Sequence, residues 1–448
     1  AGGGASQFSI TSGQPKANVE TIDAALYAQD DWRLRPHLTL SYGLRFETQT
    51  SIPDHADFAP RVALAWGLGG GNTAPRTVLR AGFGVFYDRI SPTLLMQTQH
   101  LSGVDQHQVI IMSPNFFPAV PPVSALSGIP VLPTVYQLDP KLRAPYVMQA
   151  AASIERQVSD SMTASVAYLH SRGLHQLLSR NINAPLPGTY DVAEPGSGIR
   201  PFGDVGNIFQ YESRGIFNQD QLMTNVNLKA GSKLSLQAAY TLGYAKTDTA
   251  GPSSSPANQY DLLADYGRAA YDIRHQFSAT ANIQLPSSIQ LSPFVTAQSG
   301  TPFNITLGRD LSGDSLFNAR PAFATDLSRP GVVVTRWGVF DTAPLPGQRV
   351  IPSNYGMGPA QFSINLRLSK TMGFGAMEHS DSGIGAGTRR YNMIFGISAR
   401  NLLNRLNVAA PVGNLNSPLF GQSNQISSEM LGSTSANRRV DLQVQFTF

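Results

Sequence analysis

The segment "GRDLSGDSLFNARP" (308–321) holds the side chains that are best suited to binding a metal ion. Asp310, Ser312 and Asp314 stand at alternating positions, and hard oxygen ligands at this spacing resemble the start of a calcium loop. Ser312 is a poor ligand, and no acidic residue follows at the closing position. A plain Asx turn is therefore the favoured interpretation, and we expect calcium affinity to be millimolar at most.

The histidines and the glycine-rich segments form no arrangement that predicts catalysis. The eight histidines are dispersed, and His170 and His175 lie where a strand passes into a loop, with no carboxylate nearby in the sequence. Polar loop or lumen positions explain this pair better than metal ligation does. "GFGVFYDR" (82–89) carries its glycines on a strand, so it is not a phosphate-binding loop between a strand and a helix. The sequence therefore predicts no enzyme and no cofactor.

The composition fits neither an ordinary soluble protein nor a helical membrane protein. Only 14% of the 448 residues are charged, compared with roughly 25% in soluble proteins. Hydrophobic residues make up 42%, yet no apolar run approaches the roughly 20 residues that a transmembrane helix needs. The net charge is +4, and the arginines are scattered singly. A nucleic-acid binder gathers its basic residues into a patch, so we expect no nucleic-acid partner.

Apolar and polar residues alternate in segments of about ten residues along the whole chain. "LTLSYGLRF" (38–46), "KLSLQAAYTLGYA" (233–245) and "FSINLRLSK" (362–370) each place their apolar side chains on one face. The last residues, "RVDLQVQFTF" (439–448), show the strictest alternation. About thirteen such segments recur, each long enough for a tilted strand that crosses a bilayer. The sequence predicts an all-β, antiparallel transmembrane β-barrel over residues 1–448, as a single domain.

The connections between these segments also alternate in length. Short links such as "RPH" (35–37) and "AGS" (230–232) alternate with long polar ones, which run roughly over 91–145, 174–216, 248–271, 305–359 and 405–437. Barrels of the bacterial outer membrane have short periplasmic turns and long extracellular loops. We therefore expect the outer membrane of a Gram-negative bacterium, with the lipid bilayer and lipopolysaccharide as surroundings.

The two faces of the predicted strands differ in chemistry. Aromatic residues gather at the two ends of the strands, as girdles at the two membrane interfaces require; the candidates are Trp32, Phe46, Tyr87, Tyr168, Tyr240 and Tyr244. The opposite face is polar and is expected to line the lumen, with Arg45, Arg80, Gln237, Asn365 and Arg367 among its residues. A soluble β-sandwich or propeller also has alternating strands, but long loops on one side and low charge fit it poorly.

The number of strands bears on whether the barrel can close. Phe448 is expected on the periplasmic side, and the first clear strand, near 22–34, also runs toward it, which makes the count odd. Bacterial barrels normally have an even number of strands. Either "QFSIT" (7–11) is the end of one further strand, or other strands lie upstream.

Several collinear motifs resemble those of Oar-like TonB-dependent receptors, which are outer-membrane proteins with an N-terminal carboxypeptidase-regulatory-like domain. The resemblance covers nearly the whole chain and rests on the following segments: "LYAQDDWRLRPHLTLSYGLRFE" (26–47), "DFAPRVALAWG" (57–67), "VLRAGFGVFYDRI" (78–90), "LRAPYVMQAAASIERQV" (142–158), "SRNINAPLPGTY" (179–190), "ADYGRAAYDIRHQF" (264–277), "ARNLLNRLN" (399–407) and the terminal phenylalanine.

The resemblance implies that these residues are the C-terminal portion of a barrel of 22 strands. Members of that family are about twice as long, and no leader, regulatory-like domain, plug or TonB-contact segment is recognisable here. Contact with the TonB complex is therefore expected through a missing N-terminal region. The resemblance also implies that the terminal strand, with Val444, Phe446 and Phe448, is the assembly signal that the barrel-assembly machinery reads by strand addition.

Three functions remain open at this point. The leading hypothesis is outer-membrane transport of an unidentified substrate by a TonB-dependent receptor, with the long loops as the binding surface. The alternatives are a passive, porin-like channel of about fourteen strands and a surface-binding outer-membrane protein without transport. Substrate identity depends on the loops, and a single sequence does not constrain them.

Overall fold

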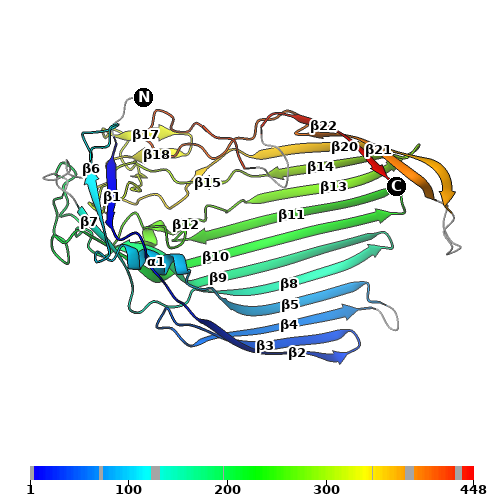
Figure 1. Ribbon diagram of the computed structural model, residues 1–448, viewed down its shortest axis with the longest axis horizontal. Coiled ribbons are helices and arrows are strands. Elements are labelled where there is room, and N and C mark those ends of the chain that lie inside the picture. Colours follow the sequence, from blue (N-terminus) through cyan, green and yellow to red (C-terminus); the bar gives the residue numbers. More distant parts are fainter. Residues whose placement is uncertain are drawn as a thin grey trace.

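The computed structural model describes residues 1–448 apart from 1–4, 70–73, 123–131, 195, 346, 379–387 and 429–435. Within the described residues, thirteen long strands follow one another in an antiparallel meander (Figure 1). They are β2 (Asp23–Arg35), β3 (Leu38–Gln49), β4 (Asp57–Leu68), β5 (Thr77–Tyr87), β8 (Tyr146–Ser159), β9 (Met162–Asn181), β10 (Asn207–Ala230), β11 (Leu234–Thr247), β13 (His275–Leu285), β14 (Ile289–Gln298), β20 (Gln361–Glu378), β21 (Thr388–Arg400) and β22 (Arg439–Thr447). The predicted all-β, antiparallel fold is confirmed.

Cross-strand register separates the two faces of this sheet along its length. Residues directly opposite each other lie on the same face, so the pairs Phe46 with Phe58 and Leu44 with Pro60 belong to one face. Apolar side chains on this outer face are widely exposed, as Leu442 at 81% shows. A contiguous exposed apolar surface of this extent is stable only against lipid. In the part of the chain that the structure describes, no helix is long and apolar enough to cross a membrane.

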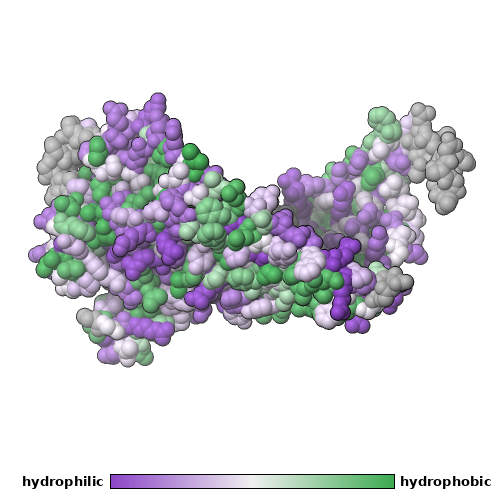
Figure 2. Space-filling model, turned by 90° about the horizontal axis from the view of Figure 1, so that it is seen from below, coloured by the Kyte–Doolittle hydropathy of each residue, from purple (hydrophilic) through white to green (hydrophobic). Residues whose placement is uncertain are grey.

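The connections fall into two groups at opposite ends of the strands. Short turns at 36–37, 160–161, 231–233 and 286–288 join strands at one end, and the long connections lie at the other (Figure 1). Viewed from below, the molecule is hollowed between the loop-bearing and the turn-bearing end (Figure 2). Among the described pairings, β2 pairs with β3 and β22 with β21. The sheet therefore has two edges, which lie apart in Figure 1.

The long loops carry their own short elements. These are β1 (Gln7–Gly13), α1 (Pro92–His100), β6 (Gln106–Met112), β7 (Leu132–Leu138), η2 (Leu262–Asp265), β12 (Gly267–Arg268), β15 (Pro302–Phe303), β16 (Ala322–Phe323), β17 (Val332–Thr335), β18 (Gly338–Asp341) and β19 (Gly356–Met357). The prediction that "QFSIT" (7–11) ends a further barrel strand was wrong. It lies in β1, which pairs with β6 in the loop layer because the apolar Phe8 and Ile10 meet Ile111 and Val109 there.

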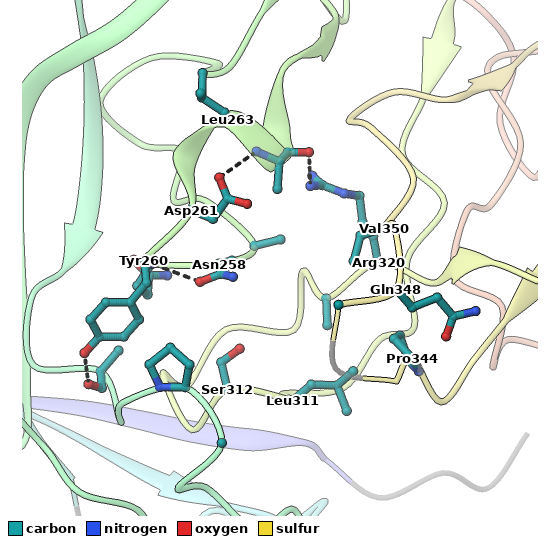
Figure 3. Close-up of a pocket in the computed structure, with 18 of the residues that line it drawn as sticks. Asn258, Tyr260, Asp261, Leu263, Leu311, Ser312, Arg320, Pro344, Gln348 and Val350 are labelled. Carbon is teal, nitrogen blue, oxygen red and sulfur yellow. Dashed lines mark hydrogen bonds between the residues drawn. The ribbon is translucent and has the colours of Figure 1, made fainter.

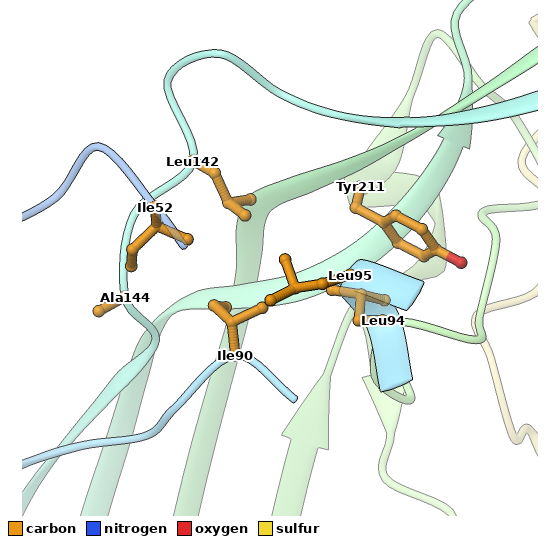
Figure 4. Packing of buried hydrophobic residues seen from close by; sticks show 7 residues of the cluster. All are labelled: Ile52, Ile90, Leu94, Leu95, Leu142, Ala144 and Tyr211. Atoms are coloured by element: carbon orange, nitrogen blue, oxygen red, sulfur yellow. The ribbon is translucent and has the colours of Figure 1, made fainter. Parts of the chain in front are cut away.

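A first hydrophobic core anchors three loops above the sheet (Figure 4). Helix α1 begins at Pro92 and is capped by Ser91, whose hydroxyl accepts the Thr93 N–H at 3.2 Å; proline at the first helical position costs no hydrogen bond. Leu94 and Leu95 of this helix pack with five further residues, which are Ile52, Ile90, Leu142, Ala144 and Tyr211. The outer ends of strands and three separate connections are thereby held together.

A second core lies in the connection between β14 and β20. Phe303, Ile305, Phe340 and Ile351 are buried together, and Trp337 packs against them. The Phe303 and Trp337 rings meet edge to face with centroids 5.1 Å apart. Phe420, from the connection before β22, packs on the same core. The long loops therefore form a packed layer with two apolar cores of its own, termed the loop layer below.

Candidate functional site

The loop layer encloses a cavity of about 820 Å³, termed the outer cavity (Figure 3). Four segments from three connections line it, and they are 184–190, 257–266, 311–320 and 344–352. Apolar lining comes from residues such as Leu263, Leu311 and Pro344, and polar lining from Asn258, Asp261 and Ser312. A mostly preformed concavity with a few placed polar groups is the usual form of a small-molecule site.

One wall of the outer cavity is a turn built around Asp310. Its Oδ1 accepts the N–H groups of Ser312 and Gly313 at 2.9 and 2.7 Å, and its Oδ2 accepts the N–H of Ser315 at 2.8 Å. Gly313 has φ +68°, and a Cβ there would meet the Tyr190 ring at 2.5 Å. The turn therefore needs glycine at this position for its conformation and for the close approach of Tyr190.

A buried amide network holds this turn against the neighbouring loops. Gln259 donates from Nε2 to Asp314 at 2.8 Å, and its Oε1 accepts the Asn181 N–H at 2.9 Å. Asn181 in turn donates to Asn207 at 2.9 Å, and Asn207 donates to Ser315 at 3.0 Å. Each amide both donates and accepts, so the buried polar groups of three connections satisfy one another. The network thereby ties this side of the cavity to the neighbouring loops.

The electrostatics of this wall depend on two neighbouring carboxyl groups. Burial and, as the second largest cause, the adjacent Asp310 carboxylate together raise the pKa of Asp314 to about 7, since two like charges disfavour ionisation. Burial also raises the pKa of the Tyr190 hydroxyl, with smaller contributions from the same two carboxyl groups. The wall therefore carries a proton near neutral pH, and the turn changes its charge when that proton leaves.

Two further loop residues shape the cavity by bonding to backbone groups. Tyr260 donates from its hydroxyl to the Ala184 carbonyl at 2.6 Å, which fixes the ring along one side. Asp261 accepts the Ala264 N–H through Oδ1 at 3.3 Å and caps η2. Its other carboxylate oxygen remains available toward the cavity (Figure 3). The arrangement suits hydrogen bonding to a polar ligand.

A second cavity of about 610 Å³, termed the inner cavity, adjoins the first. Part of its lining comes from Val147, Phe217 and Thr247, which lie on the inner face of the sheet at its loop-bearing end. Ala257 and Arg320 line both cavities.

The wall between the two cavities is built around a buried ion pair. Arg320 contacts the Asp265 carboxylate, donates to the Ile351 carbonyl at 2.9 Å and to the Ala264 carbonyl at 3.0 Å. The side chains of Arg320 and Asp265 are 5% and 8% exposed. Burial raises the pKa of Asp265, and the Arg320 charge offsets part of that rise. Removing one partner of such a pair leaves the other as a buried charge without a counter-ion.

Of the three candidate calcium ligands, Ser312 lines the outer cavity, whereas Asp310 and Asp314 are buried in the turn behind it. Asp310 directs both carboxylate oxygens to backbone N–H groups, and Asp314 accepts the Leu316 N–H and the Gln259 amide. Ser312 lies at the cavity surface. Within the described residues, no group of three or more His, Cys, Asp or Glu side chains is placed to hold a metal ion. Weak calcium binding stays a prediction.

The five residues expected to line the lumen share the inner face by register. Arg45 lies opposite Ala59, and Arg80 lies opposite Ser153 and forms an ion pair with Glu155 at 3.0 Å. The other three occupy the same face farther along the sheet, and they are Gln237, Asn365 and Arg367. Arg367 donates to Gln443 at 3.1 Å across two strands.

The aromatic candidates lie on the outer face. Phe46 meets Phe58 and Tyr87 meets Tyr146, with centroids 5.1 and 5.2 Å apart. Trp32, Tyr168, Tyr240 and Tyr244 are exposed on this face, between 37% and 58%. Val444 and Phe446 are exposed on the same face of β22, and Phe448, which follows the strand, is 91% exposed.

Sequence reasoning missed the residues that build the outer cavity. Asn181, Asn207 and Gln259 carry no local pattern, because their partners in this network lie 26 to 108 residues away. The aromatic cluster at the turn-bearing end was also missed in part. Phe374 and Tyr391 stack there with centroids 5.7 Å apart and contact Phe446. Alternation on β20 and β21 was the signal that could have found them.

An antiparallel sheet that curves around a hollow and turns its apolar side chains outward is typical of outer-membrane β-barrel proteins. Residues 2–54 and 51–440 match the family described as the outer membrane beta barrel domain, and the chain belongs to this family. The protein is therefore located in the outer membrane of a Gram-negative bacterium. No curated protein sequence matches the chain.

Solved structures of similar fold are outer-membrane transporters and receptors. The outer membrane transporter YddB from Escherichia coli superposes with a TM-score of 0.55 at 12% identity, over 95% of this chain and 45% of that chain. A mutant of the ferric enterobactin receptor PfeA from Pseudomonas aeruginosa gives 0.53 at 13% identity, over 95% and 44%. The chain thus spans less than half the length of these proteins.

Proposed function

We propose that the chain is the barrel portion of a TonB-dependent receptor of the Oar-like type, which imports a solute across the outer membrane. The observation that carries the proposal is the pair of adjoining cavities, which run from the loop layer to the inner face of the sheet. A cavity that is closed by packed loops and backed by a polar inner wall suits capture of a ligand followed by its passage inward.

The inner wall of strands β10 to β22 supports passage of a polar solute. Amide side chains recur on it, and they include Gln219, Gln221, Asn225, Asn227, Gln237, Gln276, Asn282, Gln290, Gln298, Gln361, Asn365 and Gln443. Some bond to one another, as Gln298 does to Gln361 at 2.9 Å. Amides donate and accept hydrogen bonds without charge, so a solute can exchange bonds with water for bonds with the wall.

The proposal includes three partners. Energy for import comes from the TonB complex, which contacts the receptor through a region outside these 448 residues. The barrel-assembly machinery inserts the chain and reads its terminal strand. Lipopolysaccharide and the lipid bilayer surround the outer face. The likeness of fold to known outer-membrane transporters and receptors supports this set of partners.

A passive channel and a surface-binding protein are the competing functions. A passive channel needs an open path, whereas the loop layer places two cores and a buried ion pair at the loop-bearing end. A surface-binding protein needs no cavity behind its binding surface, and here the inner cavity reaches residues of the inner wall. Both features favour import.

Deletion of the gene for the full-length protein tests the proposal. We expect at least one small solute to remain in the medium of the deletion strain, as mass spectrometry of spent medium shows. The wild-type gene should restore its removal, and Ser312→Trp should not, because a bulky ring fills the outer cavity. Leu327→Trp is the matched control, since Leu327 is 71% exposed in the same connection and does not line the outer cavity.

The outcomes separate the three functions. Removal of the solute that persists without the TonB complex indicates a passive channel. If the deletion and wild-type strains leave the same solutes in the medium, but cells of the deletion strain no longer bind a ligand, the protein is a surface-binding protein. Restoration by Ser312→Trp to the level of Leu327→Trp would exclude the outer cavity as the capture site.

A further inference from the structure

The connection between β9 and β10, residues 182–206, exposes apolar side chains in the loop layer, where no lipid covers them. The exposed apolar residues of this connection are Leu186, Val192, Ile199, Phe202 and Val205. Ile199 and Phe202 are 65% and 56% exposed. Apolar side chains that gather on a surface facing water mark a site of interaction with another molecule.

The same connection also carries negative charge. Asp191, Glu194 and Asp204 are exposed, and in the part of the chain that the structure describes none of them forms an ion pair. Arg200 is the only basic residue of this connection. It is 8% exposed, and its guanidinium donates to two backbone carbonyl groups at 2.7 and 2.8 Å. The connection, termed the acidic loop below, therefore presents three carboxylates without a counter-ion, although the whole chain has a net charge of +4.

Hydrogen bonds tie together the parts of the acidic loop that carry the exposed apolar residues. Leu186 donates its N–H to the Ile199 carbonyl at 2.8 Å and so joins the two limbs of the loop. Asn183 accepts the Phe202 N–H through Oδ1 at 2.8 Å and donates from Nδ2 to the Gly206 carbonyl at 2.7 Å. A surface that is already formed binds a partner without the cost of ordering a loop.

The acidic loop also contributes to the outer cavity. Leu186, Pro187, Gly188 and Tyr190 line this cavity, and Leu186 is bonded through its backbone to the exposed Ile199. A molecule that binds to the exposed side chains of the acidic loop therefore lies beside the outer cavity.

Charge and apolar exposure together decide which kind of partner fits. Three carboxylates repel nucleic acids and anionic headgroups, and a metal ion gains nothing from apolar neighbours. An amphipathic helix with lysine or arginine along its polar face satisfies both features. Its apolar side chains cover Ile199 and Phe202, while its cationic side chains meet the carboxylates.

We propose that the acidic loop binds a cationic, amphipathic segment of another polypeptide. Phe202 is the aromatic anchor of this surface, and Asp191, Glu194 and Asp204 select for positive charge. The inference goes beyond the proposed import of a solute, because it requires only that the loop layer faces the outside of the cell.

The test measures binding of a defined peptide to the full-length protein in discs of zwitterionic lipid, with empty discs as the reference. The probe is a fluorescent peptide of leucine and lysine that is apolar on one helical face, and an analogue with glutamate in place of lysine is the comparison ligand. Asp191→Asn/Glu194→Gln/Asp204→Asn should weaken binding of the lysine peptide about eightfold, because each exposed ion pair contributes roughly a factor of two. High salt should reduce this difference, since it screens exposed charges.

The apolar part of the surface is tested by a second variant. Phe202→Ser should weaken binding about tenfold, because aromatic anchors carry much of the energy of an interface. Phe202→Leu keeps an apolar side chain and should retain most of the binding. Heat-modifiable migration of both variants checks that the barrel is folded.

A matched control removes the same number and kind of charges from other loops. Glu20, Asp105 and Asp326 are exposed and lie outside the acidic loop. Glu20→Gln/Asp105→Asn/Asp326→Asn should bind the lysine peptide like the wild type.

Four results would overturn the inference. One is wild-type binding by the triple variant of the acidic loop or by Phe202→Ser. Another is an equal loss in the control, which indicates a general effect of net charge. The third is equal binding of the glutamate peptide, and the fourth is full competition by millimolar calcium, which indicates a cation site. Loss of peptide binding with intact solute uptake, or the reverse, separates this inference from the proposed function.

Discussion

The sheet and the loop layer arrange apolar residues in opposite ways. In the sheet, large apolar side chains point outward, and Leu442 and Phe448 are 81% and 91% exposed. In the loop layer, Phe340 and Ile90 are fully buried. The same hydrophobic effect produces both arrangements, because the sheet faces lipid whereas the loops face water. The difference teaches that hydropathy predicts a face only when the solvent of that face is known.

The largest effect is expected at the sheet edge that carries the terminal strand. Deleting Phe448 from the full-length protein should lower its level in the outer membrane sharply, because the assembly machinery then lacks the end of its signal. Phe46→Ala removes an aromatic residue of the girdle and should leave the level nearly unchanged. Quantitative blots of outer-membrane fractions measure both, and similar levels would make the terminal residue an ordinary girdle residue.

A core substitution in the loop layer should have the next largest effect. Phe340 is fully buried in the second core, and Phe→Ala changes in cores cost about 3–5 kcal/mol. We expect Phe340→Ala to open the loop layer while the sheet stays folded. Limited proteolysis should then cut between β14 and β20 with heat-modifiable migration of the barrel preserved. Simultaneous loss of both would show that the two regions unfold together.

Arginine substitutions on the sheet test its two faces directly. Leu236→Arg or Leu366→Arg should destabilise by about 2–4 kcal/mol, since the charge enters lipid near the midplane. Gln237→Arg, on the inner face next to Leu236, should cost much less because the lumen is hydrated. Equal losses in a refolding titration would contradict the assigned faces.

Smaller effects are expected from pH in the loop layer. The folded-state pKa of Asp314 is raised above the ordinary 3.8 to about 7, so its stabilising, protonated form is fully present below about pH 4. That contribution is lost as pH rises toward 7. Amide exchange in 308–316 should therefore quicken from pH 5 to pH 8, after correction for intrinsic exchange. Asp314→Asn should flatten the dependence, and an unchanged slope would assign it to another group.

The smallest effect is expected from calcium. Asp310 uses its oxygens for three backbone N–H groups, so a cation must displace these bonds. Isothermal titration of the full-length protein should give at most millimolar affinity, equal in Asp310→Asn. Micromolar binding that is lost in the variant would reinstate a calcium site.

The sheet could be predicted from the sequence to a large extent. Alternation over 38–46 and 362–370 gave both faces, because one solvent covers each face for the length of a strand. The terminal segment was equally informative, and its register puts Val444 and Phe446 on the lipid face. Prediction succeeded where the period of the structure is two residues and the partner strand is next in sequence.

The loop layer could not be predicted in the same way. The start of β10 pairs in parallel with β7, so that Asn207 meets Thr134, and this pairing leaves no periodic trace. Gln259 and Asp314 meet across 55 residues. Only α1 had a local signal, since Ser91 followed by Pro92 is a helix start. Long-range contacts between irregular segments decide the site, and a single sequence does not encode them in a pattern.

The wall around Arg320 and Asp265 bears on how fast a solute in the outer cavity can reach the inner cavity. Under the proposed import function, a solute that moves from the outer to the inner cavity has to pass this wall, and breaking a buried ion pair costs several kcal/mol. Each 1.4 kcal/mol slows a step about tenfold, so advance is far slower than entry. Filling and emptying of the outer cavity are thus two steps with different rates. If the chain imports a solute as proposed, this barrier and not the outside concentration sets how long the solute stays in the outer cavity.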